Sequence, residues 1–310
     1  MKITSTVRLK DDMVEELTES HEYTFKKKDE LTDDDKINTE IFVTYGGDLK
    51  DGEADAFPNL KWLHVMSAGV DEIPEEFFNE ALVTNSSGIH KVPMSEFALG
   101  YILDYYKNLS YLNRAQENRE WINYSKSEEL YGKEAHILGT GNIGSRLAEV
   151  LQVLGVKTVG YNTNGRSIEG FDLVHSMNEL NEKVVTADIL VNILPSTNKT
   201  KNLLTADIFK VMKSNAIFIN IGRGDIMTDD TLKEILTEKY IAHVMSDVFN
   251  EEPLPSDSPF YDFDNLTITP HCSAKTDMYL YRAFDIFKEN LGIFKTSTEL
   301  INLIDYNKGY

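Results

Sequence analysis

A glycine-rich turn between a short apolar run and a helical pattern constrains this chain more than any other stretch. Residues 136–144 read HILGTGNIG, which places the spacing G-x-G-x-x-G directly after a run that is apolar enough for a buried strand. After the glycines, apolar residues recur at the spacing of one helix face, at Ile143, Leu147, Leu151 and Leu154. A strand, a tight turn and a helix in this order predict a dinucleotide site; the alternative is a plain strand–helix corner.

The three glycines of this turn have different expected roles. Gly139 permits the tight turn, Gly141 lets the backbone approach a pyrophosphate, and Gly144 lets helix and strand pack closely. The pyrophosphate then lies on free backbone N–H groups at the positive end of the helix. We therefore predict that the whole turn binds the cofactor, through Gly139, Thr140, Gly141, Asn142, Ile143 and Gly144.

Length and composition bound the class of protein. The 310 residues suit two domains, and 41% hydrophobic residues are enough for sizeable cores. A net charge of −20 leaves no basic stripe to neutralise phosphates, so we expect no nucleic-acid partner. The single cysteine, Cys272, excludes an internal disulfide, and the histidines lack metal-ligand spacing, so we expect no metal. Because the chain shows neither a signal peptide nor 18 consecutive apolar residues, we expect a cytoplasmic protein without a membrane partner.

The first ninety or so residues predict a small unit of alternating strands and helices. A short helix is expected over 10–18, with Met13 and Leu17 facing inward, and a polar turn over 32–36. Strands separated by helices predict a parallel sheet that is covered on both faces. The expected strands are residues 2–7, 23–26, 41–45, 62–67 and 81–85.

A long helix leads out of this first unit into a second, larger one. Apolar residues from Met94 to Tyr105 follow a helical period, and a polar stretch over 113–120 comes next. Thr205 and Thr228 precede helical patterns as expected N-caps, and another amphipathic helix is expected from Leu280 to Phe294. Six strands with helices between them predict a full doubly wound domain, with strands over 135–139, 156–161, 188–194, 215–221, 241–246 and 265–269.

Charged and titratable residues follow three of these strands, where ligands bind in open parallel sheets. Arg223 stands in the turn I-G-R-G, and a guanidinium suits a carboxylate because it donates two parallel hydrogen bonds. Glu252 and His271 follow the next two strands, and a carboxylate beside a histidine favours a protonated ring that donates a proton near neutral pH. An arginine can bind a carboxylate, a glutamate–histidine pair can donate a proton, and a dinucleotide can supply a hydride. Together these groups indicate reduction of a 2-oxo acid.

At this point the sequence resembles the D-2-hydroxyacid dehydrogenase family, whose members depend on NAD(P). The resemblance covers nearly the whole chain, and its motifs occur together in the family's order. They are SAGVD at 67–71, TNSSGIH at 84–90, Glu96, YGK at 131–133, the glycine turn, LPST at 194–197, NIGRG at 220–224, DVF at 247–249, PLP at 253–255, TPH at 269–271 and KGY at 308–310.

The resemblance implies an architecture. It pairs a Rossmann-type doubly wound parallel sheet domain over 97–275 with a smaller flavodoxin-like α/β substrate domain over 1–96 and 276–310. The last helix is then expected to return to the first domain, with the active site in an interdomain cleft that domain closure dries out. The family is typically dimeric through the dinucleotide domain, so a homodimer is expected.

The resemblance also implies residue roles. Arg223 holds the substrate carboxylate, helped by the backbone N–H groups of Ala68, Gly69 and Val70. His271 acts as the acid/base, and Glu252 orients and charges it. Around the nicotinamide, the expected contacts are Leu194, Pro195, Ile221, Gly222 and Asp247, with Asp247 near the carboxamide.

One departure from the fingerprint concerns the choice of cofactor. An acidic residue is expected at the end of the second strand to hold the ribose 2′-OH, but the count from Gly144 lands on Asn162. A carboxylate would repel a 2′-phosphate, whereas donors at Asn162, Thr163 and Asn164 with the charge of Arg166 suit one. We therefore expect NADP(H) to be preferred and NAD(H) to remain possible, the alternative being that Asn162 binds a plain ribose.

The sequence thus predicts a 2-oxo acid reductase that interconverts a small 2-oxo acid and a D-2-hydroxy acid. Glyoxylate or hydroxypyruvate and a branched or aromatic 2-oxo acid all stay open as substrates. The rival is a non-catalytic NAD(P)-sensing binding protein of the same fold, since this fold also serves transcriptional co-repressors. Weak candidates for the substrate side-chain pocket are Tyr45, Met94, Tyr281 and Arg282.

Overall fold

The computed structural model describes residues 1–70, 72–123 and 127–306. The chain divides into two compact units, which are described one at a time below. The first consists of Met1–Ile89 and Thr276–Tyr310, and the second of His90–Lys275. Asp71 and the KGY tail, both part of the resemblance, lie outside the described residues.

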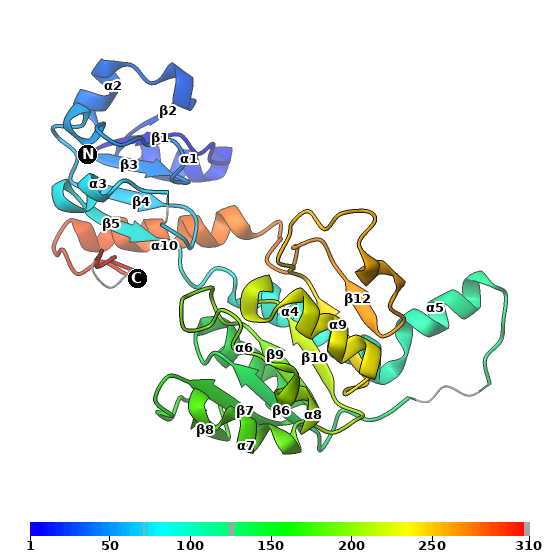
Figure 1. The fold of residues 1–310 in the computed structure, drawn as a ribbon. Coiled ribbons are helices and arrows are strands. Elements are labelled where there is room, and N and C mark those ends of the chain that lie inside the picture. The colour runs from blue at the N-terminus through cyan, green and yellow to red at the C-terminus, as the bar shows by residue number, and fades with distance from the viewer. Residues whose placement is uncertain (71, 124–126, 307–310) are drawn as a thin grey trace. The chain divides into compact units, whose positions relative to one another are not determined.

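The first unit is built on a five-stranded parallel sheet (Figure 1). The strand order is β2-β1-β3-β4-β5, which is the flavodoxin-like order 2-1-3-4-5. The strands are β1 (Lys2–Ser5), β2 (Glu22–Phe25), β3 (Ile41–Thr44), β4 (Trp62–Val65) and β5 (Leu82–Asn85). The α-helices of this unit are α1 (Asp11–Thr18), α2 (Asp33–Asn38), α3 (Glu75–Glu80) and α10 (Tyr279–Phe294).

Both faces of this sheet are buried, because alternate residues of a strand point to opposite sides. Ile41 and Trp62 belong to a core on one face, which also contains Phe287 of α10. Phe42 and Leu63 belong to a second core on the other face. Every residue of β3 and β4 is buried, so these central strands are fixed between two helical layers. Their carboxyl ends therefore carry loops on a rigid base.

The second unit is built on a seven-stranded parallel sheet in the order β12-β11-β10-β9-β6-β7-β8. Taken from β8, the first six strands follow the chain in the order 3-2-1-4-5-6, and β12 is added beyond them, so this is a Rossmann-type sheet. The strands are β6 (Glu134–Leu138), β7 (Lys157–Asn162), β8 (Leu173–Ser176), β9 (Ile189–Asn192), β10 (Ile217–Asn220), β11 (His243–Ser246) and β12 (Leu266–Ile268). Its α-helices are α4 (Lys91–Lys107), α5 (Leu109–Glu117), α6 (Asn142–Val153), α7 (Leu180–Lys183), α8 (Ala206–Lys210) and α9 (Asp229–Glu238).

The predicted α/β class and the two sheet types are confirmed, but several local predictions were wrong. The stretch 32–36 is not a turn: Thr32 caps α2, its hydroxyl accepting from the N–H of Asp35 at 3.2 Å. The polar stretch over 113–120, for which the sequence predicted no element, lies largely within α5, whose exposed surface explains its polarity. The second sheet has a seventh strand, β8, whose half-exposed LVHS sequence lacks a strand pattern. Leu154 caps α6 instead of joining its buried face, and its side chain is 38% exposed.

Within the described residues, no helix is long and apolar enough to cross a membrane. The same residues contain no group of three histidine, cysteine, aspartate or glutamate side chains that could hold a metal ion.

Candidate active site

The glycine turn joins β6 to α6 and can be made only with glycine at two positions. Gly139 follows β6 with a φ of +106°, in the region that side-chain-bearing residues rarely adopt. A Cβ on Gly144 would lie 2.0 Å from the carbonyl oxygen of Gly139, so helix and turn could not approach as they do. The turn therefore places the first residues of α6 directly at the end of the strand.

The N-terminus of α6 is suited to an anion. The N–H of Ser145 donates to the carbonyl of Gly141 at 2.9 Å, so the three preceding N–H groups have no acceptor in the helix. A Cβ on Gly141 would meet nothing within 4 Å, which leaves the turn open to a ligand. The hollow beside it has a volume of about 520 Å³, and its lining includes Lys91, Asn142 and Arg146, whose guanidinium pairs with the lining carboxylate of Glu149 at 3.1 Å. Free N–H groups and two cations fit the pyrophosphate of a dinucleotide.

The end of β7 differs from what the sequence alone suggested for Asn162. Its amide oxygen accepts from the N–H groups of Gly165 at 2.7 Å and Asn164 at 3.3 Å. Its amide nitrogen donates to the carbonyl of Arg166 at 2.9 Å and to the Thr140 hydroxyl at 3.3 Å. Asn162 thus folds the loop 163–166 and ties it to the glycine turn, while Thr163, Asn164 and Arg166 are exposed.

The ends of β9 and β10 pack closely against the glycine turn. Asn192 donates from its side-chain amide to the side-chain oxygen of Asn220 at 2.9 Å, a buried pair that joins the two strand ends. A Cβ on Gly222 would lie 2.7 Å from the carbonyl oxygen of Leu194. A Cβ on Gly139 would be 3.5 Å from the Leu194 side chain. The segments 194–195 and 221–222, both predicted to border the cofactor, therefore lie together at one edge of the sheet.

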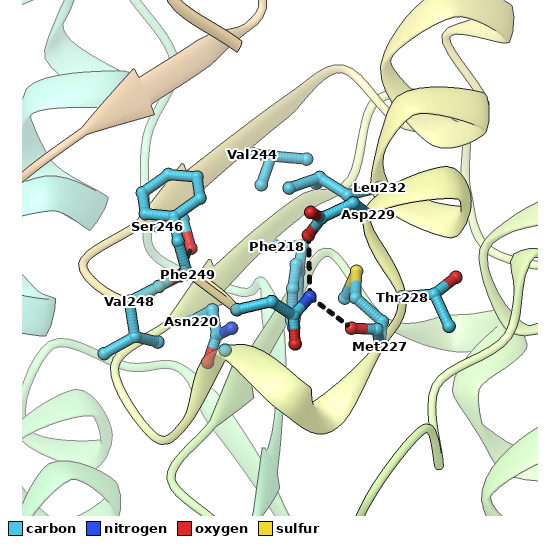
Figure 2. A pocket seen from close by; sticks show the side chains of 12 residues that line it. Phe218, Asn220, Met227, Thr228, Asp229, Leu232, Val244, Ser246, Val248 and Phe249 are labelled. Carbon is cyan, nitrogen blue, oxygen red and sulfur yellow. Dashed lines mark hydrogen bonds between the residues drawn. The ribbon is translucent and has the colours of Figure 1, made fainter. Parts of the chain in front are cut away.

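Arg223 is exposed at the end of β10, in a turn that is held against the loop after β11. A Cβ on Gly224 would lie 2.1 Å from the carbonyl carbon of Phe249, so only glycine allows this contact. The crevice beside it holds about 10 Å³, room for about one water molecule and for no larger ligand. Figure 2 shows Val248 and Phe249 on one side of it and Met227 and Asp229 on the other.

Two hydrogen bonds close that crevice, drawn as dashed lines in Figure 2. The Asn250 amide donates to the Met227 carbonyl at 3.1 Å and to the Asp229 carboxylate at 2.7 Å. The loop that carries Arg223 and the loop that leads to Glu252 are thereby locked to each other.

Asp247 organises the loop that carries His271. Its carboxylate is buried and accepts from the N–H groups of Cys272 at 2.9 Å and Ser273 at 2.8 Å and from the Thr269 hydroxyl at 2.7 Å. Burial raises the pKa of Asp247, but these hydrogen bonds outweigh it, so the pKa lies below its usual value. His271 itself has a φ of +49°, a left-handed conformation that needs such support.

His271 and Glu252 form a pair at the carboxyl ends of the strands. The ring Nδ1 of His271 lies 2.6 Å from Glu252 Oε2, and Glu252 Oε1 accepts from the Phe249 N–H at 2.9 Å. Because one ring nitrogen is held by the carboxylate, the other is left for a reacting group. A hollow of about 790 Å³ lies beside the pair, lined mostly by apolar side chains such as Leu254, Phe260 and Ile268.

His90 belongs to this neighbourhood and was not predicted as a site residue. Burial lowers the pKa of its ring; a backbone hydrogen bond with Ala274 opposes this, and the nearby charge of Arg223 lowers it further. The ring is therefore neutral near pH 7. Its position in the motif TNSSGIH was the only signal in the sequence, and that motif says nothing of its neighbours.

The first unit carries the other predicted site residues, in the loop after β4. Among the described residues, the N–H groups of Ala68, Gly69 and Val70 have no hydrogen-bond acceptor, while the Ala68 carbonyl is held by the Asn85 amide at 2.6 Å. Three such N–H groups in succession suit a carboxylate.

The four weak candidates for the substrate pocket lie in different surroundings. Tyr45 lines a hollow beside Gly69 and Val70. Tyr281 has the Lys10 ammonium 3.9 Å above its ring, and Arg282 lies on the same helix, α10. Met94 is buried in the core of the second unit.

Comparisons with known proteins agree with this geometry. The family model for the D-isomer specific 2-hydroxyacid dehydrogenase, NAD binding domain, matches residues 99–273. An uncharacterized protein of Corynebacterium melassecola is 30% identical over 84% of this chain and 88% of its own length. The chain belongs to the D-isomer specific 2-hydroxyacid dehydrogenase family.

Other members of the family agree in sequence and in structure. A glyoxylate reductase of Aeropyrum pernix is 30% identical over 80% of this chain and 77% of its own length. A solved family member from Aeromonas salmonicida subsp. salmonicida A449 is 28% identical, with a TM-score of 0.83 over 98% of this chain and 99% of its own. The predicted family and the predicted enzyme class, a nicotinamide-dependent dehydrogenase acting on 2-hydroxy acids, are thereby confirmed.

Proposed function

We propose that this dehydrogenase is an NADP(H)-preferring reductase of small 2-oxo acids. The observation that carries the proposal is the pairing of His271 with Glu252 at 2.6 Å, at the same sheet edge as Arg223 and the glycine turn. A proton donor, a carboxylate-binding cation and an anion-binding helix end are the three groups that such a reduction needs.

In the proposed reaction each residue acts on a different part of the substrate. Arg223 and the N–H groups of Ala68, Gly69 and Val70 bind the substrate carboxylate and so orient the keto group. His271 donates a proton from its free ring nitrogen to the keto oxygen, while Glu252 stabilises the charged ring before the transfer. A nicotinamide held at this sheet edge would supply the hydride that reduces the keto carbon. Leu194, Pro195, Ile221 and Gly222 shape the edge against which that ring would pack.

The loop after β7 supports the preference for NADP(H). It offers no carboxylate to a ribose 2′-OH, and the Asn162 amide is occupied in folding the loop. Thr163, Asn164 and Arg166 are exposed there, and a hydroxyl, an amide and a guanidinium suit a 2′-phosphate. Asn162 acts in this proposal by shaping the loop.

Glyoxylate and hydroxypyruvate are the proposed substrates to test first. The relative from Aeropyrum pernix is a glyoxylate reductase, and one from Photorhabdus laumondii, 28% identical over 81% of this chain, is a glyoxylate/hydroxypyruvate reductase. Branched and aromatic 2-oxo acids stay in the panel because an apolar hollow lies beside His271. A homodimer in the cytoplasm, without nucleic-acid or membrane partners, completes the proposal.

The test mixes the protein with NADPH or NADH and a panel of glyoxylate, hydroxypyruvate, pyruvate, phenylpyruvate and 2-oxoisocaproate. We expect NADPH oxidation with at least one acid and a lower kcat/KM with NADH. If NADPH binds but is never oxidised, the proposal fails in favour of an NAD(P)-sensing binding protein. If NADH gives equal or better efficiency, the cofactor preference is wrong and the reductase assignment stands.

A further inference from the structure

A hollow in the first unit contains a carboxylate that the proposed reaction does not use. It lies at the carboxyl ends of β3 and β4 and has a volume of about 280 Å³. Its lining brings a negatively charged side chain together with the loop that presents the carboxylate-binding N–H groups. The lining residues are Tyr45, Gly46, Ser67, Gly69, Val70 and Glu72.

Glu72 lies along the turn that follows β3. A Cβ on Gly47 would lie 2.8 Å from Glu72 Oε2, and one on Gly46 would lie 3.5 Å from Glu72 Cβ. The two glycines thus leave space for the acidic side chain. The Lys28 ammonium donates to the carbonyl of Gly47 at 2.7 Å, but no cation of the described chain lies within ion-pair distance of Glu72. Among the described residues, the carboxylate therefore faces the hollow without a direct ion pair.

We propose that Glu72 determines substrate specificity by excluding 2-oxo acids that carry a second negative charge. This inference rests on the proposed function, in which Gly69 and Val70 bind the C1 carboxylate. The substituent on the keto carbon then lies in or beside the same hollow, close to Glu72. A carboxylate accepts hydrogen bonds but donates none, so it tolerates hydrogen and favours a hydroxyl. It repels a distal carboxylate or phosphate.

The size of this effect follows from the charges. Two like charges about 7 Å apart, at an effective dielectric constant of about 30, repel strongly enough to change an association constant by about tenfold. Glyoxylate has no substituent beyond its aldehyde hydrogen and feels Glu72 only through the C1 carboxylate that all these substrates share, so the ratio to glyoxylate isolates the effect of the second charge. The repulsion is screened by salt, since the hollow is open to solvent.

Glu72→Gln tests this directly, because it removes the charge and keeps the shape. Glu80→Gln is the matched control: Glu80 is an exposed residue at the end of α3, in the same unit, and its replacement changes the net charge equally. For each protein, kcat/KM is measured with NADPH and glyoxylate, hydroxypyruvate, oxaloacetate or 2-oxoglutarate. We expect Glu72→Gln to raise the dicarboxylate-to-glyoxylate ratio of kcat/KM about tenfold and Glu80→Gln to leave it within twofold.

Two further outcomes are distinguishable. If glyoxylate or hydroxypyruvate is reduced but the ratio in Glu72→Gln stays within twofold of the unaltered protein, the specificity role is wrong and the proposed function stands. If no 2-oxo acid is reduced by any of the three proteins, the proposed function itself fails.

A salt series gives an independent check of the repulsion. Raising the ionic strength should increase the dicarboxylate-to-glyoxylate ratio of kcat/KM more in the unaltered protein than in Glu72→Gln. An equal increase in both proteins overturns the inference.

Discussion

His271 Nδ1 lies 2.6 Å from Glu252 Oε2, and the other oxygen of this carboxylate, Oε1, accepts from the N–H of Phe249 at 2.9 Å. The pair is therefore anchored to the backbone after β11 and does not depend on a mobile side chain. The arrangement leaves the second ring nitrogen of His271 free of the carboxylate and able to meet a substrate. Its proposed role in proton transfer can be tested without altering the fold.

Replacing His271 with alanine should remove most of the turnover. General acid catalysis contributes about 10²–10⁴-fold, so kcat with the best 2-oxo acid should fall by that range. Glu252→Gln should reduce kcat less, because the amide oxygen can still accept from the ring, at the cost of the hydrogen bond from the Phe249 N–H, but the amide no longer stabilises the charge of the ring. NADPH affinity, followed by fluorescence titration, should change less than twofold in both variants. Near-normal turnover in His271→Ala would refute the acid/base assignment.

Arg223→Ala should act on substrate capture rather than on the proton. Its guanidinium is exposed, and within the part of the chain that the structure describes it donates only to the neighbouring carbonyl of Gly222 at 2.9 Å, so we expect the variant to fold. Losing a bidentate pair to a carboxylate should raise KM by at least tenfold. Steady-state kinetics with glyoxylate separate the two effects. A fall in kcat at unchanged KM would show that Arg223 acts on the transition state alone.

Asp247→Asn separates two roles for one residue. The resemblance places Asp247 near the nicotinamide carboxamide, whereas the structure shows its carboxylate accepting three hydrogen bonds from the loop of His271. An asparagine nitrogen cannot accept from a backbone N–H, so the loop should shift. We expect kcat to fall while the NADPH dissociation constant changes less than twofold. Thr269→Val, which removes one of the three donors, should show the same pattern more weakly.

A raised NADPH dissociation constant with unchanged kcat in Asp247→Asn would instead indicate that Asp247 contacts the nicotinamide. The pH dependence of folding stability gives a second test of the hydrogen bonds to Asp247. The folded-state pKa of Asp247 is depressed, so its stabilisation is present above the unfolded pKa and is lost as pH falls through the folded value. The stability difference between the unaltered protein and Asp247→Asn should therefore shrink in acid.

The cofactor preference can be inverted at the end of β7. Asn162→Asp places a carboxylate at this strand end, where it repels a 2′-phosphate. Because the variant also loses the amide donor to the Arg166 carbonyl and the Thr140 hydroxyl, its Tm is measured beside its kinetics. The kcat/KM with NADPH should fall at least tenfold, while that with NADH should be unchanged or higher. Arg166→Ala should lower the NADPH efficiency and leave the NADH efficiency within twofold. If Arg166→Ala affects both cofactors equally, Arg166 does not contact the 2′-phosphate.

The sequence predicted those features that local chemistry decides. The glycine turn follows from steric limits at Gly139 and Gly144, and the order of strands brings Glu252 and His271 to one edge. Features that depend on which partners meet in space were missed. The contact of Asn162 with the cofactor stays a prediction, but the sequence did not reveal that its amide binds four groups of its own neighbourhood. Glu72 lines a hollow only because the loops after β3 and β4 meet, and no spacing in the chain reveals that.

Alanine substitutions at two glycines of the same turn should affect different properties, stability at Gly144 and cofactor affinity at Gly141. Gly144→Ala places a Cβ 2.0 Å from the Gly139 carbonyl, and such overpacking destabilises by about 1–3 kcal/mol or more. Gly141→Ala meets no atom within 4 Å, so the free energy of unfolding should be unchanged, but the methyl group projects where the cofactor is proposed to lie. We expect a raised NADPH dissociation constant for Gly141→Ala and a lowered Tm for Gly144→Ala. Unchanged cofactor affinity in Gly141→Ala would contradict the proposed placement of the pyrophosphate.

His64 should make the first unit sensitive to acid. Its ring is fully buried, which lowers its pKa to about 3. Its Nδ1 lies 2.8 Å from the Thr84 hydroxyl, whose oxygen already accepts from Trp62 Nε1 at 2.8 Å. The hydroxyl can donate its proton to an unprotonated Nδ1, which suits a neutral ring. On the other side, Nε2 lies 3.2 Å from the Ser86 hydroxyl.

Below pH 6.5 the unfolded chain takes up a proton on His64 that the folded unit does not. The stabilisation from the neutral ring is thus complete above the unfolded pKa of about 6.5 and declines as pH falls towards 3, by about 1.4 kcal/mol per pH unit. Urea unfolding followed by the fluorescence of buried Trp62 reports on this unit, and Trp121→Phe removes the exposed second tryptophan. In the Trp121→Phe protein, His64→Gln should reduce the slope of the unfolding free energy against pH between pH 6.5 and 4. The reduction should correspond to about one proton fewer taken up on unfolding. An unchanged slope would show that His64 is protonated in the folded protein.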